Sequence, residues 1–189
     1  WNQVDPAWPD APIKLFGPGS DSGTFDYFTE AIVGKSKSSR GDFTASEDDN
    51  VLVQGVTQDV NAIGYFGYAY YAENQSRLRA VPIVDKPGSP AVSPSEKSVL
   101  DGSYQPLARP IFIYVSTKAM AKPEVKEFVE YYMKEGARLA KEVKYVQLPS
   151  VAYKTNLEHL AKGKKGTVFG GMAEVGVTIE ALLAREAKH

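Results

Sequence analysis

Short strand-like segments alternate with amphipathic helical segments along the first part of the chain. Apolar and polar residues alternate over 13–16, and β-branched and aromatic residues dominate 62–66. Between and after them, apolar residues recur at helical spacing over 25–32 and 52–60. Strands interleaved with helices are typical of an α/β architecture. The sequence therefore predicts an α/β fold.

Turn and cap residues set the expected boundaries of these elements. Gly34 predicts the end of the first helix, and a polar, cationic loop is expected over 35–43. The run Ser46–Asp49 resembles a capping box at the start of the second helix. A short helix is expected over 68–73, and the proline-rich stretch 85–95 predicts a loop.

The second half of the chain has a different character. A strand is expected over 78–84, with Pro82 placing it at an edge or a crossover, and 110–115 is the strongest strand pattern. Helical patterns dominate afterwards, over 122–144, 150–162 and 179–188, the last with Thr178 as its cap. This change near residue 105 indicates two lobes.

Composition excludes several classes of protein. The 189 residues suffice for one core or two small lobes, and a net charge of −1 argues against a nucleic-acid-binding protein. No cysteine is present, which excludes a disulfide framework and a thiolate zinc site. No apolar run approaches a membrane span, and no signal-peptide pattern is found. Because the first residue is Trp1 rather than Met, we expect a mature or trimmed product.

The stretch Gly19–Thr24, GSDSGT, immediately precedes the first helical pattern. The N-terminus of a helix offers unpaired N–H groups and a partial positive charge, which together favour an oxyanion. Ser22 and Thr24 add hydroxyl donors, and Gly23 lets an anion approach the backbone without a Cβ in the way. An ordinary serine N-cap is the alternative reading of the same residues. The residues alone leave both readings open.

A bound dianion usually needs a full cation as well. The nearest candidate is Arg40, in the loop that also carries Lys35 and Lys37. It is either a solvated loop arginine or a donor that folds back over the helix start.

Catalytic, nucleotide and metal motifs are incomplete. Ser22 as a nucleophile would need an adjacent base, and the only histidines are His159, on a helical pattern, and the final His189. The P-loop and dinucleotide-binding patterns each lack a required glycine. The acids Glu47–Asp49 do not have EF-hand spacing, and their position fits a helix start favoured by the helix dipole. We therefore expect no enzyme activity, no metal and no cofactor.

Several long motifs resemble the phosphate-binding proteins of bacterial phosphate ABC importers. They are FGPGSDSGTFDYFTE (16–30), SRGDFTASEDDNVLVQG (39–55), AIGYFGYAYY (62–71), the opening 1–9, and the tail segments 166–171 and 175–179. The resemblance covers essentially the whole chain. It implies a type II periplasmic-binding fold, in which two lobes close on one phosphate by hinge motion. It also favours the anion-cradle reading of the helix start.

The resemblance implies a phosphate site at Ser22, Gly23 and Thr24, with Ser20 as a weaker candidate. In the better-known branch of the family an arginine precedes this Ser-Gly-Thr by four residues, where this chain has Pro18. Arg40 is the expected substitute.

Family members are longer, and the resemblance implies that the N-terminal half of the first lobe is missing here. That half would supply further phosphate ligands, including the aspartate that distinguishes phosphate from sulfate. The expected division is 1–9 as a hinge or crossover, 10–103 as the complete second lobe and 104–189 as the C-terminal part of the first.

The function that the resemblance implies is phosphate binding and delivery to the membrane permease of an ABC importer. It implies a location in the periplasm or on a lipid anchor outside the cytoplasmic membrane, and a monomer at full length. Two alternatives remain: a receptor for sulfate, molybdate or tungstate, and a Ser22-based hydrolase or phosphatase.

Overall fold

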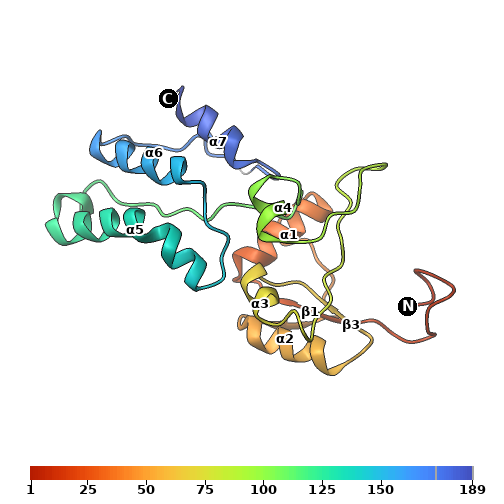
Figure 1. Cartoon of the computed structure of the whole chain (residues 1–189). Helices are drawn as coiled ribbons and strands as arrows, with labels where there is room; N and C mark the ends of the chain where they lie inside the picture. Colours follow the sequence, from red (N-terminus) through yellow and green to blue (C-terminus); the bar gives the residue numbers. More distant parts are fainter. Residues whose placement is uncertain (173, 189) are drawn as a thin grey trace. The chain divides into compact units, whose positions relative to one another are not determined.

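The computed structural model describes residues 1–172 and 174–188. The chain forms two compact units, Trp1–Val81 and Pro82–His189, drawn from red to yellow and from yellow-green to blue in Figure 1. The resemblance predicts a different division, into lobes over 10–103 and 104–189. Because that division refers to a complete two-lobed protein, it stays a prediction.

A parallel three-stranded sheet organises the first unit. The central strand β1 (Lys14–Pro18) pairs with β2 (Thr44–Ser46) on one side and with β3 (Ala62–Gly64) on the other. Phe16 lies opposite both Thr44 and Gly64. Because all three strands run in the same direction, their carboxyl ends meet at one edge of the sheet.

Helices cover both faces of this sheet, α1 (Gly23–Val33) on one side and α2 (Asp49–Gln58) on the other (Figure 1). The short helix α3 (Tyr68–Glu73) follows β3. The core includes Phe25 from α1 and Leu52 and Val53 from α2. The helix α2 approaches β1 closely because Gly55 faces the Phe16 ring, where a Cβ would overlap the ring atoms. The α/β prediction is confirmed.

One expectation in the first unit is wrong in detail. The second helix begins at Asp49, with Asp48 as its N-cap, because the Asp48 carboxylate accepts from the Asn50 N–H at 2.9 Å. Ser46 instead ends β2, where it lies opposite Pro18. The opening segment turns back on itself: the Trp1 and Trp8 rings contact edge-on, and the Trp1 indole N–H donates to Asn61 O at 3.1 Å.

Helices dominate the second unit. They are α4 (Glu96–Leu100), a 3₁₀ turn (Ala119–Ala121), α5 (Pro123–Glu142), α6 (Ser150–Ala161) and α7 (Ile179–Glu186). The helix α5 packs against α6, where Gly136 faces the Tyr153 ring. Thr178 caps α7 as expected, its hydroxyl accepting from Ala181 N–H at 3.2 Å. The helix α4, which was not predicted from the sequence, begins at a capping box formed by Ser95 and Ser98.

The strand expected over 110–115 is wrong. This segment carries no strand, and among the described residues none of Ile111–Val115 makes a backbone hydrogen bond. The side chains of Ile111–Tyr114 are exposed, Tyr114 to 77%. A β-strand requires a neighbouring strand to satisfy its backbone, and the described residues supply none. The strand expected over 78–84 is reduced to one antiparallel bridge, between Ile83 and Val92.

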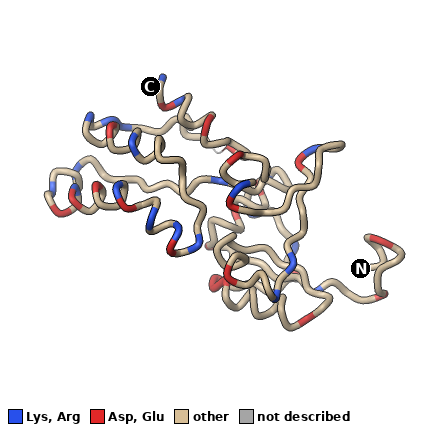
Figure 2. Tube along the Cα trace, viewed as in Figure 1, with Lys and Arg blue, Asp and Glu red and all other residues tan. Residues whose placement is uncertain are grey.

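Charged residues of both signs are interspersed along each unit rather than gathered into one basic face (Figure 2). On α5, Arg138 donates to Glu135 and Glu142, one turn before and one turn after it. Within the described part of the chain, no helix is long and apolar enough to cross a membrane.

Candidate functional site

Three loops meet at the carboxyl edge of the sheet in the first unit. The first follows β1 and leads into α1, the second joins β2 to α2, and the third joins β3 to α3. In parallel α/β sheets ligands bind outside the carboxyl ends of the strands, next to the strand at which the order reverses. Here the reversal falls at β1, which has β2 on one side and β3 on the other. The loop after β1 contains the GSDSGT stretch.

Ser22 is the N-cap of α1. Its backbone is extended (φ −85°, ψ 128°), and its Oγ accepts from the Thr24 N–H at 3.1 Å. Gly23 is the first residue of the helix. A serine hydroxyl that accepts one hydrogen bond still carries an O–H that can be donated. The cap geometry therefore leaves Ser22 able to donate to an oxyanion, so capping and anion binding are compatible roles for this side chain.

The structure brings Ser20, Ser22, Gly23 and Thr24 together in one turn of chain. Ser20 is exposed, and its carbonyl oxygen accepts a hydrogen bond from the Lys37 ammonium. These residues thus form a polar turn at the start of α1. Whether these four residues bind an anion stays a prediction.

A carboxylate already occupies this turn. Glu47, in the loop after β2, accepts a hydrogen bond from the Asp21 N–H, with 3.3 Å between nitrogen and Oε1. Its carboxylate lies against Gly19, where any Cβ would overlap it. The buried glycine therefore permits an anionic group to approach the backbone before α1. Here the group is part of the chain itself.

Asp49 adds a second carboxylate at the same edge. Its Oδ2 accepts from the Gly67 N–H at 3.2 Å and so links the start of α2 to the loop after β3. Burial raises the pKa of the Asp49 carboxyl, and the neighbouring charges of Asp48 and Glu47 raise it further, against the lowering effect of the Gly67 hydrogen bond. The edge is therefore rich in acids.

Arg40, the expected counter-charge, pairs with Asp42. Its Nε donates to Asp42 Oδ1 at 2.7 Å and its Nη2 donates to Oδ2. These hydrogen bonds raise the pKa of Arg40 and lower that of Asp42. Arg40 is largely exposed, and among the described residues it contacts none of Ser20, Ser22, Gly23 and Thr24. Its role at the site stays a prediction.

Lys37 contacts the turn, although its sequence position did not predict this. Its Nζ donates to Ser20 O at 3.2 Å and lies 3.9 Å from Asp26 Oδ1. Its backbone N–H donates to Thr29 Oγ1 at 2.8 Å, and Thr29 is only 3% exposed. The sequence carried no signal for this arrangement, because a lysine in a polar loop resembles any solvated lysine.

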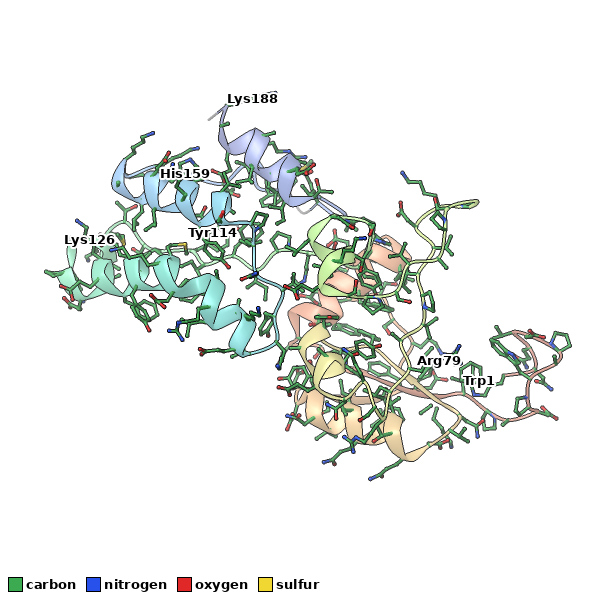
Figure 3. The ribbon with its side chains drawn as sticks, in the orientation of Figure 1. Trp1, Arg79, Tyr114, Lys126, His159 and Lys188 are labelled. Carbon is green, nitrogen blue, oxygen red and sulfur yellow. The ribbon has the colours of Figure 1, made fainter. Side chains whose placement is uncertain are left out.

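The histidines considered as a catalytic base do not lie at this edge of the sheet. His159 lies on α6, where its Nδ1 is 2.9 Å from Glu186 Oε2, and His189 lies outside the described residues (Figure 3). In the portion of the chain that is described, no group of three or more His, Asp or Glu residues is arranged to hold a metal ion.

The sequence profile of a PBP superfamily domain matches residues 1–135. The chain belongs to the PBP superfamily. The match spans the whole first unit, with its parallel sheet and the turn before α1, and extends into α5 of the second unit.

Individual members of the superfamily are similar over nearly the whole chain. Protein SphX of Synechococcus elongatus is 50% identical over 186 residues, which cover 98% of this chain and 55% of SphX. The phosphate-binding protein PstS of Staphylococcus haemolyticus is 38% identical over 168 residues, 87% of this chain and 51% of PstS. The chain thus spans about half the length of the curated relatives it matches.

A solved structure shares the fold. The crystal structure of a possible phosphate binding protein from Planctomyces limnophilus is 48% identical, with a TM-score of 0.71. The superposed part covers 87% of this chain and 58% of that protein. The expected periplasmic-binding fold is thereby confirmed for the part that this chain represents.

Proposed function

We propose that this chain is part of a receptor that binds inorganic phosphate and delivers it to the membrane permease of an ABC importer. Ser22, Gly23 and Thr24 would hold the phosphate oxygens with backbone N–H groups and hydroxyls. The observation that carries the proposal is the Ser-Gly-Thr helix start at the carboxyl edge of a parallel sheet. The names of PstS and of the Planctomyces limnophilus protein support phosphate as the ligand.

The proposal requires no chemical step. Phosphate is bound and released unchanged, so the site needs hydrogen-bond donors and a positive charge but no nucleophile and no cofactor. A receptor of this kind works outside the cytoplasmic membrane, free in the periplasm or anchored by a lipid, and we propose that it acts as a monomer at full length.

The proposal also concerns the remaining half of the cleft. Residues 10–103 would form one lobe, reached through the crossover 1–9, and 104–189 would be a share of the other. The longer relatives contain sequence outside the part that matches this chain. The unpaired segment Ile111–Val115 would then pair with a strand formed by such additional sequence. Phosphate would be enclosed only when both lobes are complete.

Replacing Thr24 tests the site. Thr24→Ala removes one hydroxyl donor without altering the Ser22 cap, because the cap uses the Thr24 backbone N–H. In a polypeptide with both lobes, phosphate affinity measured by calorimetry is expected to fall about tenfold to a hundredfold, the value of one hydrogen bond to a charged group.

Replacing Arg40 tests the expected counter-charge. Arg40→Ala is expected to weaken phosphate binding to a similar degree if the Arg40 guanidinium leaves Asp42 and pairs with phosphate on binding.

Thr57→Ala is the matched control, because Thr57 lies on α2 of the same unit and its hydroxyl donates only to Gln54 O. Unchanged phosphate affinity in Thr24→Ala and Arg40→Ala together would remove this site from consideration. Tighter binding of sulfate, molybdate or tungstate than of phosphate in competition would identify a different oxyanion receptor. Release of product from a phosphoester or acyl ester would contradict a pure binding role.

A further inference from the structure

We propose that Lys37 is a phosphate-binding residue: its ammonium group supplies positive charge to the helix start of α1, in addition to any contribution from Arg40. The inference rests on the function proposed above, and it adds a residue that neither the motif nor the family comparison indicates.

The position of Lys37 is set by the protein core. The Thr29 hydroxyl is buried in α1, donates to Phe25 O at 2.8 Å, and accepts from the Lys37 N–H at 2.8 Å. Lys37 holds a left-handed backbone conformation (φ 64°), which costs energy in a residue with a Cβ. Such a conformation persists only when surrounding contacts stabilise it, and here the hydrogen bond to the buried Thr29 hydroxyl does so. The loop is therefore fixed over α1 at this residue.

From this anchor the side chain reaches back along α1 to its N-terminus. The ammonium lies 3.2 Å from the carbonyl oxygen of Ser20, two residues before the N-cap. It also lies 3.9 Å from Asp26 Oδ1, a side-chain oxygen that is buried and has no hydrogen-bond partner in the described structure. An ammonium has three donors, and the carbonyl of Ser20 uses one of them. Donors are left for an oxyanion at the Ser22–Thr24 turn.

The charge balance of the turn requires a cation. Within the first unit, Glu47 contacts Asp21 N–H, and Asp26 lies in the first turn of α1. A dianion placed beside these carboxylates would be repelled unless a positive charge stood close by. Arg40 is paired with Asp42, whereas Lys37 lies at the turn. Binding would move the Lys37 ammonium onto the phosphate and displace the Glu47 carboxylate from Asp21.

A plain structural role for Lys37 is the competing explanation. As an exposed partner of Asp26, with 58% of the lysine side chain accessible, it would contribute little to stability and nothing to binding. The two explanations differ in what happens when phosphate is added.

The test is a titration of this chain with inorganic phosphate, followed by the amide NMR signals of Ser22, Gly23 and Thr24, which detect millimolar affinity. Lys37→Met is expected to weaken the apparent affinity about tenfold, the effect of one nearby charge at intermediate dielectric. Lys37→Arg is expected to keep the affinity within about threefold, because the positive charge is preserved at the same position in the chain. Lys35→Met is the matched control, since it removes an equal charge from the same loop.

The outcomes separate the two proposals. Equal affinity of wild type and Lys37→Met, with Thr24→Ala weakened, would overturn the role of Lys37 and leave the site intact. Equal losses in Lys37→Met and Lys35→Met would also overturn it, because general charge would then explain the effect. If phosphate shifts none of the three signals in the wild-type chain, the proposed site itself is wrong, and this inference fails with it.

Discussion

Asp49 shows how the carboxyl edge of the sheet couples stability to pH. Burial raises the pKa of its carboxyl, so the folded state disfavours the charged form. A group with a raised folded pKa contributes stability below its unfolded pKa, and this contribution is lost as the pH rises through the folded value. The first unit should therefore lose part of its stability as the pH rises above about 4.

Asp49→Asn should remove this loss, because the amide oxygen can still accept from Gly67 N–H. At pH 7 the variant should be more stable than wild type, by no more than about 1 kcal/mol because the group is only half buried. Urea unfolding followed by tryptophan fluorescence measures the change, since Trp1 and Trp8 both lie in the first unit. Asp10→Asn, on the surface of the same unit, is the control. A difference that does not depend on pH would contradict this explanation.

Single residues also mark the limit of what the sequence could predict about the site. Ser22, Gly23 and Thr24 were identifiable as candidate residues because a polar, glycine-containing turn before a helix can cap the helix or bind an anion. The cation that lies at the turn could not be predicted in this way, because the position of a long side chain in a loop depends on its surroundings. Arg40 pairs with Asp42, and its role at the turn stays a prediction, whereas the backbone contact with the buried Thr29 fixes the position of Lys37.

The secondary-structure elements show the same difference between what local sequence determines and what depends on distant partners. The helices ending at Gly34 and beginning after Thr178 were predicted because caps are local. The strand at 110–115 was not formed, because strand formation depends on a partner rather than on β-propensity. The ring of Phe128 on α5 is likewise left 62% exposed in the described part of the chain.

The packing of α5 on α6 gives a prediction at this scale. A Cβ on Gly136 would lie 2.8 Å from Tyr153 Cε1, so Gly136→Ala forces the helices apart or moves the ring. In an exposed helix the same change would stabilise by about 1 kcal/mol. Here overpacking should outweigh that gain and leave a net loss of about 1–2 kcal/mol.

Urea unfolding followed by far-UV circular dichroism measures this loss, since α5 and α6 are the two longest helices of the described structure. Tyr153→Leu serves as the second arm of a double-mutant cycle, because it removes the ring atoms that the new Cβ meets. In that background Gly136→Ala should become neutral or stabilising. A stabilising effect in the wild-type background would show that the contact is not tight.

The two units of the molecule differ in secondary structure: the first contains a paired sheet, and the second contains an extended segment that is not paired as a strand. The first unit holds the candidate anion site, with three paired strands and helices on both faces. The second is helical, and its segment Ile111–Val115 has no backbone partner among the described residues. This asymmetry, with a chain about half the length of its curated relatives, predicts that the site works at full strength only in a longer polypeptide.

Phosphate affinity should therefore depend strongly on the length of the polypeptide. An anion held by one helix start stays hydrated on its open side, and it lacks the hydrogen bonds that a second lobe would donate. Two missing charge-assisted hydrogen bonds would weaken binding by about 3–6 kcal/mol, or at least about a hundredfold. Calorimetry on a two-lobed polypeptide and NMR titration of this chain give the two affinities. Thr24→Ala should lower both affinities by the same factor, because both polypeptides contain the N-terminus of α1. Equal wild-type affinities would instead mean that α1 and its turn form a self-sufficient anion site.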